Sequence, residues 1–94
     1  AYFFQTLKSF EKKLMRFCNQ DKKIVREIIA NLMKGVGSSI EKDGDLDHLI
    51  KAVASKKGTT EAGLKSLKSN NLNQIFEKGL NAAIKRSKEI SNEF

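Results

Sequence analysis

Proline and tryptophan are absent from this 94-residue sequence, and cysteine and histidine each occur only once. The single cysteine, Cys18, excludes a disulfide within the chain and fits a reducing compartment. Neither Cys18 nor His48 has the companions that a zinc site needs. The sequence therefore predicts no metal site, and Cys18 is interpreted as an ordinary helix residue, because a lone free cysteine usually behaves as a small apolar side chain.

Long apolar runs are also missing. No stretch of 18 apolar residues occurs, so no membrane-spanning helix is expected, and no signal-peptide pattern is present. The sequence begins at Ala1, already inside an apolar periodic pattern, which leads us to expect a piece of a longer protein. We expect a cytoplasmic location and no membrane partner.

Charge is abundant, with 18 Lys and Arg against 11 Asp and Glu, a net charge of +7. Such an excess attracts nucleic acid or anionic membranes without specificity. The basic residues are spread over every segment, however, and no aromatic-studded basic groove or nucleic-acid motif is found. We interpret them as solvated helix faces and predict no nucleic-acid partner. A stand-alone basic helical binding module remains the alternative, and DNA affinity that falls steeply with salt would favour it.

Apolar residues recur at steps of three and four along most of the chain, and no alternating strand pattern competes. A chain of this length buries only about two-thirds of its surface when it folds alone, so a partner subunit would help it. The sequence predicts one all-α domain over residues 1–94. Five helices are expected, over about Tyr2 to Phe17 or Asn19, Lys22 to Lys42, Leu46 to Ala54, Thr60 to Lys68, and Leu72 to Ser91.

Two of these helices carry unusual residues. In the first, the apolar stripe is rich in aromatic side chains, so it forms either the intramolecular core or a surface that packs partly against another subunit. In the second, Gly35 and Gly37 cost about 1 kcal/mol each relative to Ala. They indicate a close helix crossing or a bend, with a helix end near Lys34 as the alternative. The apolar stripe of the first helix consists of Phe3, Leu7, Phe10, Leu14 and Phe17.

Polar residues mark the helix boundaries. Asp21 is the predicted N-cap of the second helix and Asp45 starts the third, whose buried face is expected to be Leu46, Leu49, Ile50 and Val53. Asn70 or Asn71 is expected to adopt the left-handed conformation at the end of the fourth helix. Counting from Asp43, a calcium loop would need Gly at position six and Glu at position twelve, which are His48 and Ala54 here, so calcium is rejected. His48 is interpreted as a surface residue.

The most informative stretch is the polar loop that leads into the fourth helix. Gly58 allows a positive φ or a close approach to the backbone, and Thr59 or Thr60 is a predicted N-cap. Glu61 then lies in the first turn, where a negative charge suits the helix dipole. The outward amides of this turn, beside Lys56 and Lys57, would seat a carboxylate or phosphate, although a plain helix start explains the same residues.

The stretch Ser55-Lys56-Lys57-Gly58-Thr59-Thr60, the Ala62-Gly63-Leu64 that follows, and the later Arg86-Ser87-Lys88-Glu89-Ile90 resemble the C-terminal domain of pyrroline-5-carboxylate reductases. That family carries Ser-Pro-Gly-Gly-Thr-Thr, Ala-Gly-Leu and Arg-Ser-Lys-Glu-Leu at these places. The resemblance extends over essentially the whole chain, including the opening Ala1-Tyr2. Lys56-Lys57 replaces the family's Pro-Gly, so the path of the loop is expected to differ.

The resemblance implies an interlocked helical dimerisation domain, similar to the C-terminal domain of 6-phosphogluconate dehydrogenase. It implies a homodimer, with a larger ring of dimers left open. Members of the family reduce pyrroline-5-carboxylate to L-proline with NADPH or NADH, which an N-terminal Rossmann domain absent from this chain would bind. The chain alone would bind no cofactor and would be inactive. A structural dimeriser whose active loop has decayed is a further alternative.

By position, the resemblance makes Gly58, Thr59 and Thr60 the cradle for the substrate carboxylate, with Ser55 shaping it. Thr60 would also be the catalytic contact, because its hydroxyl would reach the ring nitrogen. A cradle of this kind contributes by positioning the substrate for hydride transfer rather than by acid-base chemistry. Lys56 and Lys57 would act as electrostatic helpers.

Overall fold

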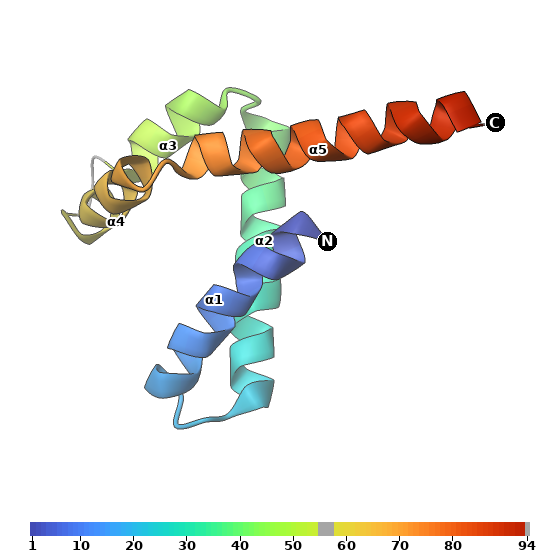
Figure 1. Cartoon of the computed structure of the whole chain (residues 1–94). Helices are drawn as coiled ribbons and strands as arrows, with labels where there is room; N and C mark the ends of the chain where they lie inside the picture. Colours follow the sequence, from blue (N-terminus) through green and yellow to red (C-terminus); the bar gives the residue numbers. More distant parts are fainter. Residues whose placement is uncertain (55–57, 94) are drawn as a thin grey trace. The chain divides into compact units, whose positions relative to one another are not determined.

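The computed structural model describes residues 1–54 and 58–93, and these residues form five α-helices with no strand among them. The all-α prediction is confirmed. Three helix ends differ from the prediction, because the fourth helix begins at Gly58 and ends at Ser69, and the fifth continues to Glu93. The helices are α1 (Tyr2–Phe17), α2 (Lys22–Lys42), α3 (Leu46–Ala54), α4 (Gly58–Ser69) and α5 (Leu72–Glu93), as Figure 1 shows.

The turn between α1 and α2 reverses the chain. Asn19 and Gln20 both have positive φ, at 49° and 64°. Asp21 follows as the N-cap of α2, since its Oδ1 accepts hydrogen bonds from the amides of Lys23 at 3.0 Å and Ile24 at 3.2 Å. The predicted cap is confirmed, and Cys18 lies at the C-cap of α1 rather than within the helix. The result is an antiparallel pair of helices.

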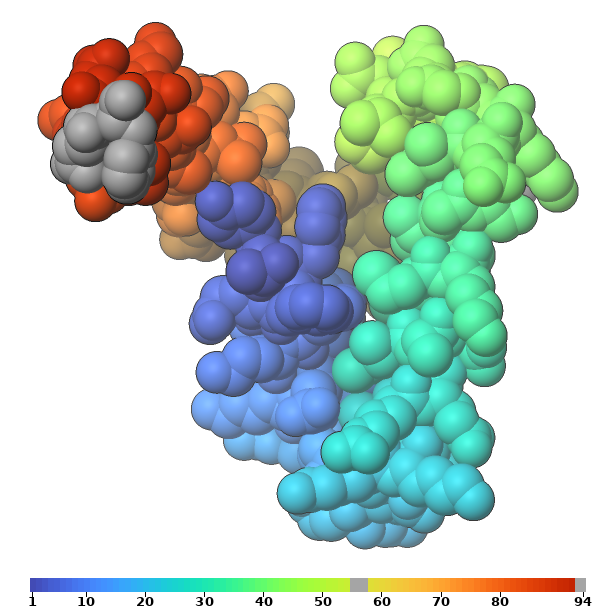
Figure 2. Space-filling view, turned by 90° about the vertical axis from the view of Figure 1, so that its right-hand side faces the viewer, coloured from blue at the N-terminus to red at the C-terminus, as the bar shows by residue number. Residues whose placement is uncertain are grey.

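Contacts divide the chain into two parts, one over Ala1–Leu49 and one that begins at Ile50. In the first part α1 packs on α2, and the two lie side by side in both Figure 1 and Figure 2. In the second part α4 packs on the start of α5. Asn71, with φ of 60°, makes the turn between α4 and α5, as predicted for one of the two asparagines.

The apolar stripe of α1 is divided by the contact with α2. Val25 of α2 is the one fully buried residue of the described chain, at 1% exposure. Leu7 and Leu14 of α1 are half-buried. The three phenylalanines of the stripe are instead exposed, with fractions of 75% for Phe3, 48% for Phe10 and 82% for Phe17. One helix partner covers only part of a stripe this wide.

The predicted buried face of α3 is largely wrong for the single chain. Leu49 is half-buried, but Leu46, Ile50 and Val53 are exposed. An apolar helix face is buried only when another element lies against it, and the spacing of residues does not supply that element. None of the helices in the described residues combines the length and the hydropathy that a bilayer-spanning helix needs.

The two glycines of α2 neither end the helix nor meet another element. α2 continues without interruption through Gly35 and Gly37, so the alternative end near Lys34 is wrong. A Cβ built at either glycine would meet no atom within 4 Å. The predicted close crossing therefore does not occur within the described chain.

Candidate functional site

The residues that the sequence singled out for ligand binding lie at the start of α4. Gly58, Thr59 and Thr60 form its first turn, and Glu61 lies there too, as predicted. Gly58 and Thr59 are exposed, and Thr60 is half-buried. Ser55, Lys56 and Lys57 lie outside the described residues. The prediction that Thr59 or Thr60 caps the helix is wrong, because the helix already includes both.

The first turn of α4 presents backbone amides at a helix N-terminus. The first amides of a helix have no carbonyl one turn earlier within the helix to accept their hydrogen bonds, and the dipole adds partial positive charge there. A Cβ built at Gly58 would meet no atom within 4 Å, so the backbone is open to an approaching group. The described glycines all have ordinary negative φ, so Gly58 contributes open space rather than a left-handed turn.

The negative charge of Glu61 has two opposite effects at this turn. Glu61 stabilises the helix, because a carboxylate near the N-terminus suits the dipole. The same charge opposes an anionic ligand at the amides. A ligand carboxylate would therefore need the amides and hydroxyls of Gly58, Thr59 and Thr60 acting together.

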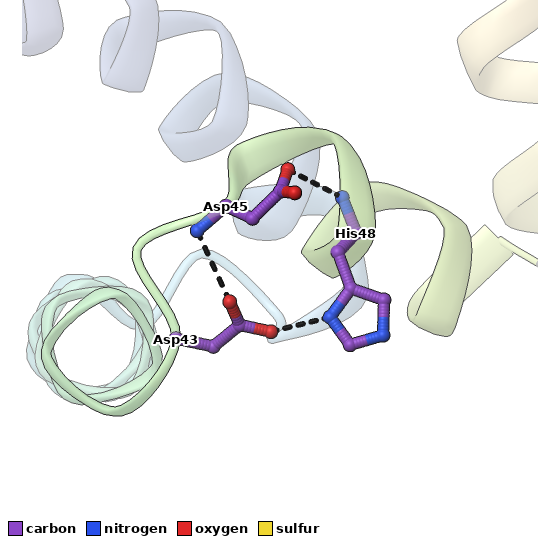
Figure 3. Close-up of polar contacts among 3 residues, drawn as sticks. All are labelled: Asp43, Asp45 and His48. Carbon is purple, nitrogen blue, oxygen red and sulfur yellow. Dashed lines mark hydrogen bonds and ion pairs between the residues drawn. The ribbon is translucent and has the colours of Figure 1, made fainter.

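A second polar cluster lies between α2 and α3, where the sequence indicated a turn and a helix start at Asp45 (Figure 3). The Asp45 amide donates to Asp43 Oδ1 at 3.1 Å, and the His48 amide donates to Asp45 Oδ1 at 3.1 Å. His48 Nδ1 contacts Asp43 Oδ2. A carboxylate only accepts, so Nδ1 carries the hydrogen in this pair. Asp45 thus caps α3 as predicted, and Asp43 in turn holds Asp45.

Hydrogen bonding from the His48 ring holds the pKa of Asp43 below its ordinary value of 3.8. The Asp45 amide and the charge of His48 act in the same direction, whereas burial opposes them. A carboxylate and a histidine serve catalysis when the other ring nitrogen meets a nucleophile. Here the His48 side chain is 70% exposed and the carboxylates are engaged by the backbone, so the cluster is a structural tie. His48 is a surface residue, as predicted.

Comparison with known proteins identifies the family. The family model described as pyrroline-5-carboxylate reductase dimerisation matches residues 1–90. A pyrroline-5-carboxylate reductase of Staphylococcus aureus (strain COL) is 47% identical over 73 residues, which cover 77% of this chain and 27% of the relative. Relatives of the same name from Staphylococcus haemolyticus and Staphylococcus saprophyticus are 43% and 40% identical over 72 and 74 residues, or 76% and 78% of this chain.

The chain spans only 27% of the length of these relatives, so the matched part is a minor portion of each. No solved structure gives a significant match.

Proposed function

Because the chain belongs to the pyrroline-5-carboxylate reductase dimerisation family, we propose that it is the helical, self-associating part of such a reductase. The complete enzyme would reduce pyrroline-5-carboxylate to L-proline in the cytoplasm. In this proposal residues 1–94 act as one domain. The observation that carries it is the family match over residues 1–90. The free, half-buried Cys18 is compatible with a reducing compartment.

The reductant would be NADPH or NADH, held by another part of the full-length enzyme. Dinucleotides bind in the Rossmann manner where a strand runs into a glycine-rich turn and a helix. The described residues are helical and contain no strand, so this chain does not fit such a cofactor. Its own residues would bind and orient the substrate.

The site for the substrate carboxylate would be the first turn of α4. Open backbone at Gly58 and the outward amides of the turn support this assignment. Thr59 and Thr60 would add hydroxyl donors, with Thr60 directed at the ring nitrogen. Ser55 would complete the cradle by analogy with the family motif. Holding the ring at two points would fix one face toward the hydride donor, which is catalysis by positioning.

Self-association is supported by the surface that the chain leaves open. Phe3 and Phe17 of α1 and Ile75 of α5 are 75%, 82% and 62% exposed, and exposed apolar side chains of this kind mark a contact with another protein. Burial of that surface would supply hydrophobic stabilisation that a single chain lacks. Assembly beyond the dimer, into a ring of dimers, is compatible with the same surface.

Replacing Thr60 in the full-length enzyme tests the substrate site. Thr60→Ala removes a hydroxyl that would contact the substrate, so kcat/KM should fall about tenfold or more, the effect of one lost hydrogen bond in a desolvated site. The melting temperature should stay close to that of the wild type. Ser66→Ala, on an exposed position of the same helix, is the matched control and should leave both quantities unchanged. If Thr60→Ala kept the wild-type kcat/KM, the assignment of Thr60 to the substrate site would be wrong.

A further inference from the structure

The first turn of α4 contains one charged residue, Glu61, whose side chain is exposed. It follows directly after Thr60 and precedes Ala62. The Gly-Thr-Thr before it and the Ala-Gly-Leu after it both match the motif of the reductase family, and Glu61 belongs to neither. The residues that the motif specifies around it are uncharged, so Glu61 sets the charge of this turn.

Helix geometry directs the Glu61 side chain toward the start of α4. Gly58 and Glu61 are three residues apart, and residues at this spacing are neighbours on one face of a helix, with Cβ positions about 5–6 Å apart. Each Cα–Cβ bond tilts toward the N-terminus of its helix, so a side chain covers the turn that precedes it. A Cβ built at Gly58 would meet no atom within 4 Å. The Glu61 carboxylate is therefore within reach of the open backbone at Gly58.

A fixed negative charge at this place acts on a ligand according to the charges that the ligand carries. Like charges repel, and the repulsion grows where a bound ligand displaces water. A ligand with one carboxylate is repelled by Glu61, and a ligand with two carboxylates is repelled more strongly. In a ring with a protonated nitrogen next to the carboxylate, attraction between the nitrogen and Glu61 offsets the repulsion.

We propose that Glu61 is a specificity-determining residue, which favours ligands with a protonated ring nitrogen beside the carboxylate and disfavours ligands with a net negative charge. The inference rests on the proposed function, in which the first turn of α4 binds the substrate carboxylate. The amides of this turn and the dipole of α4 attract any carboxylate. Glu61 weakens that attraction unless the ligand brings its own positive charge.

Competitive inhibition of the full-length enzyme by three compounds with the same five-membered ring tests this role. Near neutral pH, L-proline has no net charge, cyclopentanecarboxylate has one negative charge, and cis-cyclopentane-1,2-dicarboxylate has up to two. Glu61→Gln removes the charge of residue 61 and keeps its shape. The inhibition constant should fall about fivefold for the monocarboxylate and about twentyfold for the dicarboxylate, but stay within about twofold for L-proline. Added salt should reduce these changes, because it screens an exposed charge.

Glu61→Asp is the matched control, because it retains the negative charge in the first turn and should keep the wild-type ratios of the three inhibition constants. Unchanged ratios in Glu61→Gln would overturn the role of Glu61. Thr60→Ala distinguishes that result from a failure of the proposed function, since it should weaken all three ligands if this turn binds the carboxylate. If neither Thr60→Ala nor Glu61→Gln altered any inhibition constant, the substrate site itself would be wrong.

Discussion

Asp43 makes two polar contacts that the local sequence pattern did not reveal. One carboxylate oxygen accepts from the Asp45 amide, and the other contacts the His48 ring. Its lowered pKa means that the folded chain favours the ionised carboxylate. The resulting contribution to the free energy of unfolding is fully present at pH values above 3.8, the ordinary pKa of the carboxyl. It is lost as the pH falls through the lowered folded value.

Removing the His48 ring should therefore change the pKa of Asp43. In His48→Ala, the pKa of Asp43 should rise toward 3.8, because the ring is the largest cause of the lowering. A pH titration of the Asp43 carboxyl carbon by NMR measures this. Lys51→Ala, on the same helix, is the control and should leave the Asp43 titration unchanged. An unaltered midpoint in His48→Ala would show that the backbone amide alone sets the value.

At the scale of single residues, the candidate site could be predicted only in part. Gly58, Thr59 and Thr60 are consecutive, so any helical start places them in one turn, and their chemistry follows from the motif. The exposure of Thr59 and the half-burial of Thr60 depend on neighbours that no local rule supplies. The contact between Asp43 and His48 spans five residues across a helix connection, a spacing that matches no helical or strand period.

Among the helices, α2 is the one whose start is best defined. Asp21 Oδ1 satisfies two amides of the first turn that have no partner within the helix. The two left-handed residues before it set the direction in which the chain enters. This combination of turn and cap brings α2 back along α1, and so decides which of their residues meet.

Deleting the cap should weaken the chain measurably. Asp21→Ala leaves two amides without their side-chain acceptor and should lower the free energy of unfolding by about 1 kcal/mol. Urea unfolding followed by circular dichroism at fixed protein concentration measures the change. Lys22→Ala, one residue further on, is the control and should stay within about 0.5 kcal/mol of the wild type. Equal stability of Asp21→Ala and the wild type would mean that solvent replaces the cap at no cost.

For the whole molecule, the decisive property is how little of it is buried. Only Val25 is fully covered in the described chain, so hydrophobic stabilisation within one copy is small. A chain of this kind folds stably when association and folding are coupled. The exposed phenylalanines of α1 and the exposed apolar residues of α3 and α5 are then the surface whose burial completes the fold.

If folding is coupled to association, the thermal stability of the chain should depend on protein concentration. The melting temperature of the 94-residue chain should rise by about 3 °C for each tenfold increase in protein concentration, because mass action favours the associated state. Differential scanning calorimetry over a hundredfold range measures the slope. Phe10→Glu, which places a charge on the apolar stripe of α1, should flatten the slope, whereas Lys12→Glu, on the opposite side of the same helix, should not. A wild-type melting temperature that is independent of concentration would contradict coupled folding.

The sequence by itself determined the five helices, the Asp21 cap, a left-handed turn at Asn70 or Asn71 and the family, because these depend on residues close together or on a shared motif. Only the tertiary structure decided which residues of the α1 stripe meet α2. Periodicity sets where a side chain lies around its own helix, while burial depends on which other element occupies that side. For that reason Leu7 and Leu14 lie against α2, and Phe3, Phe10 and Phe17 remain open.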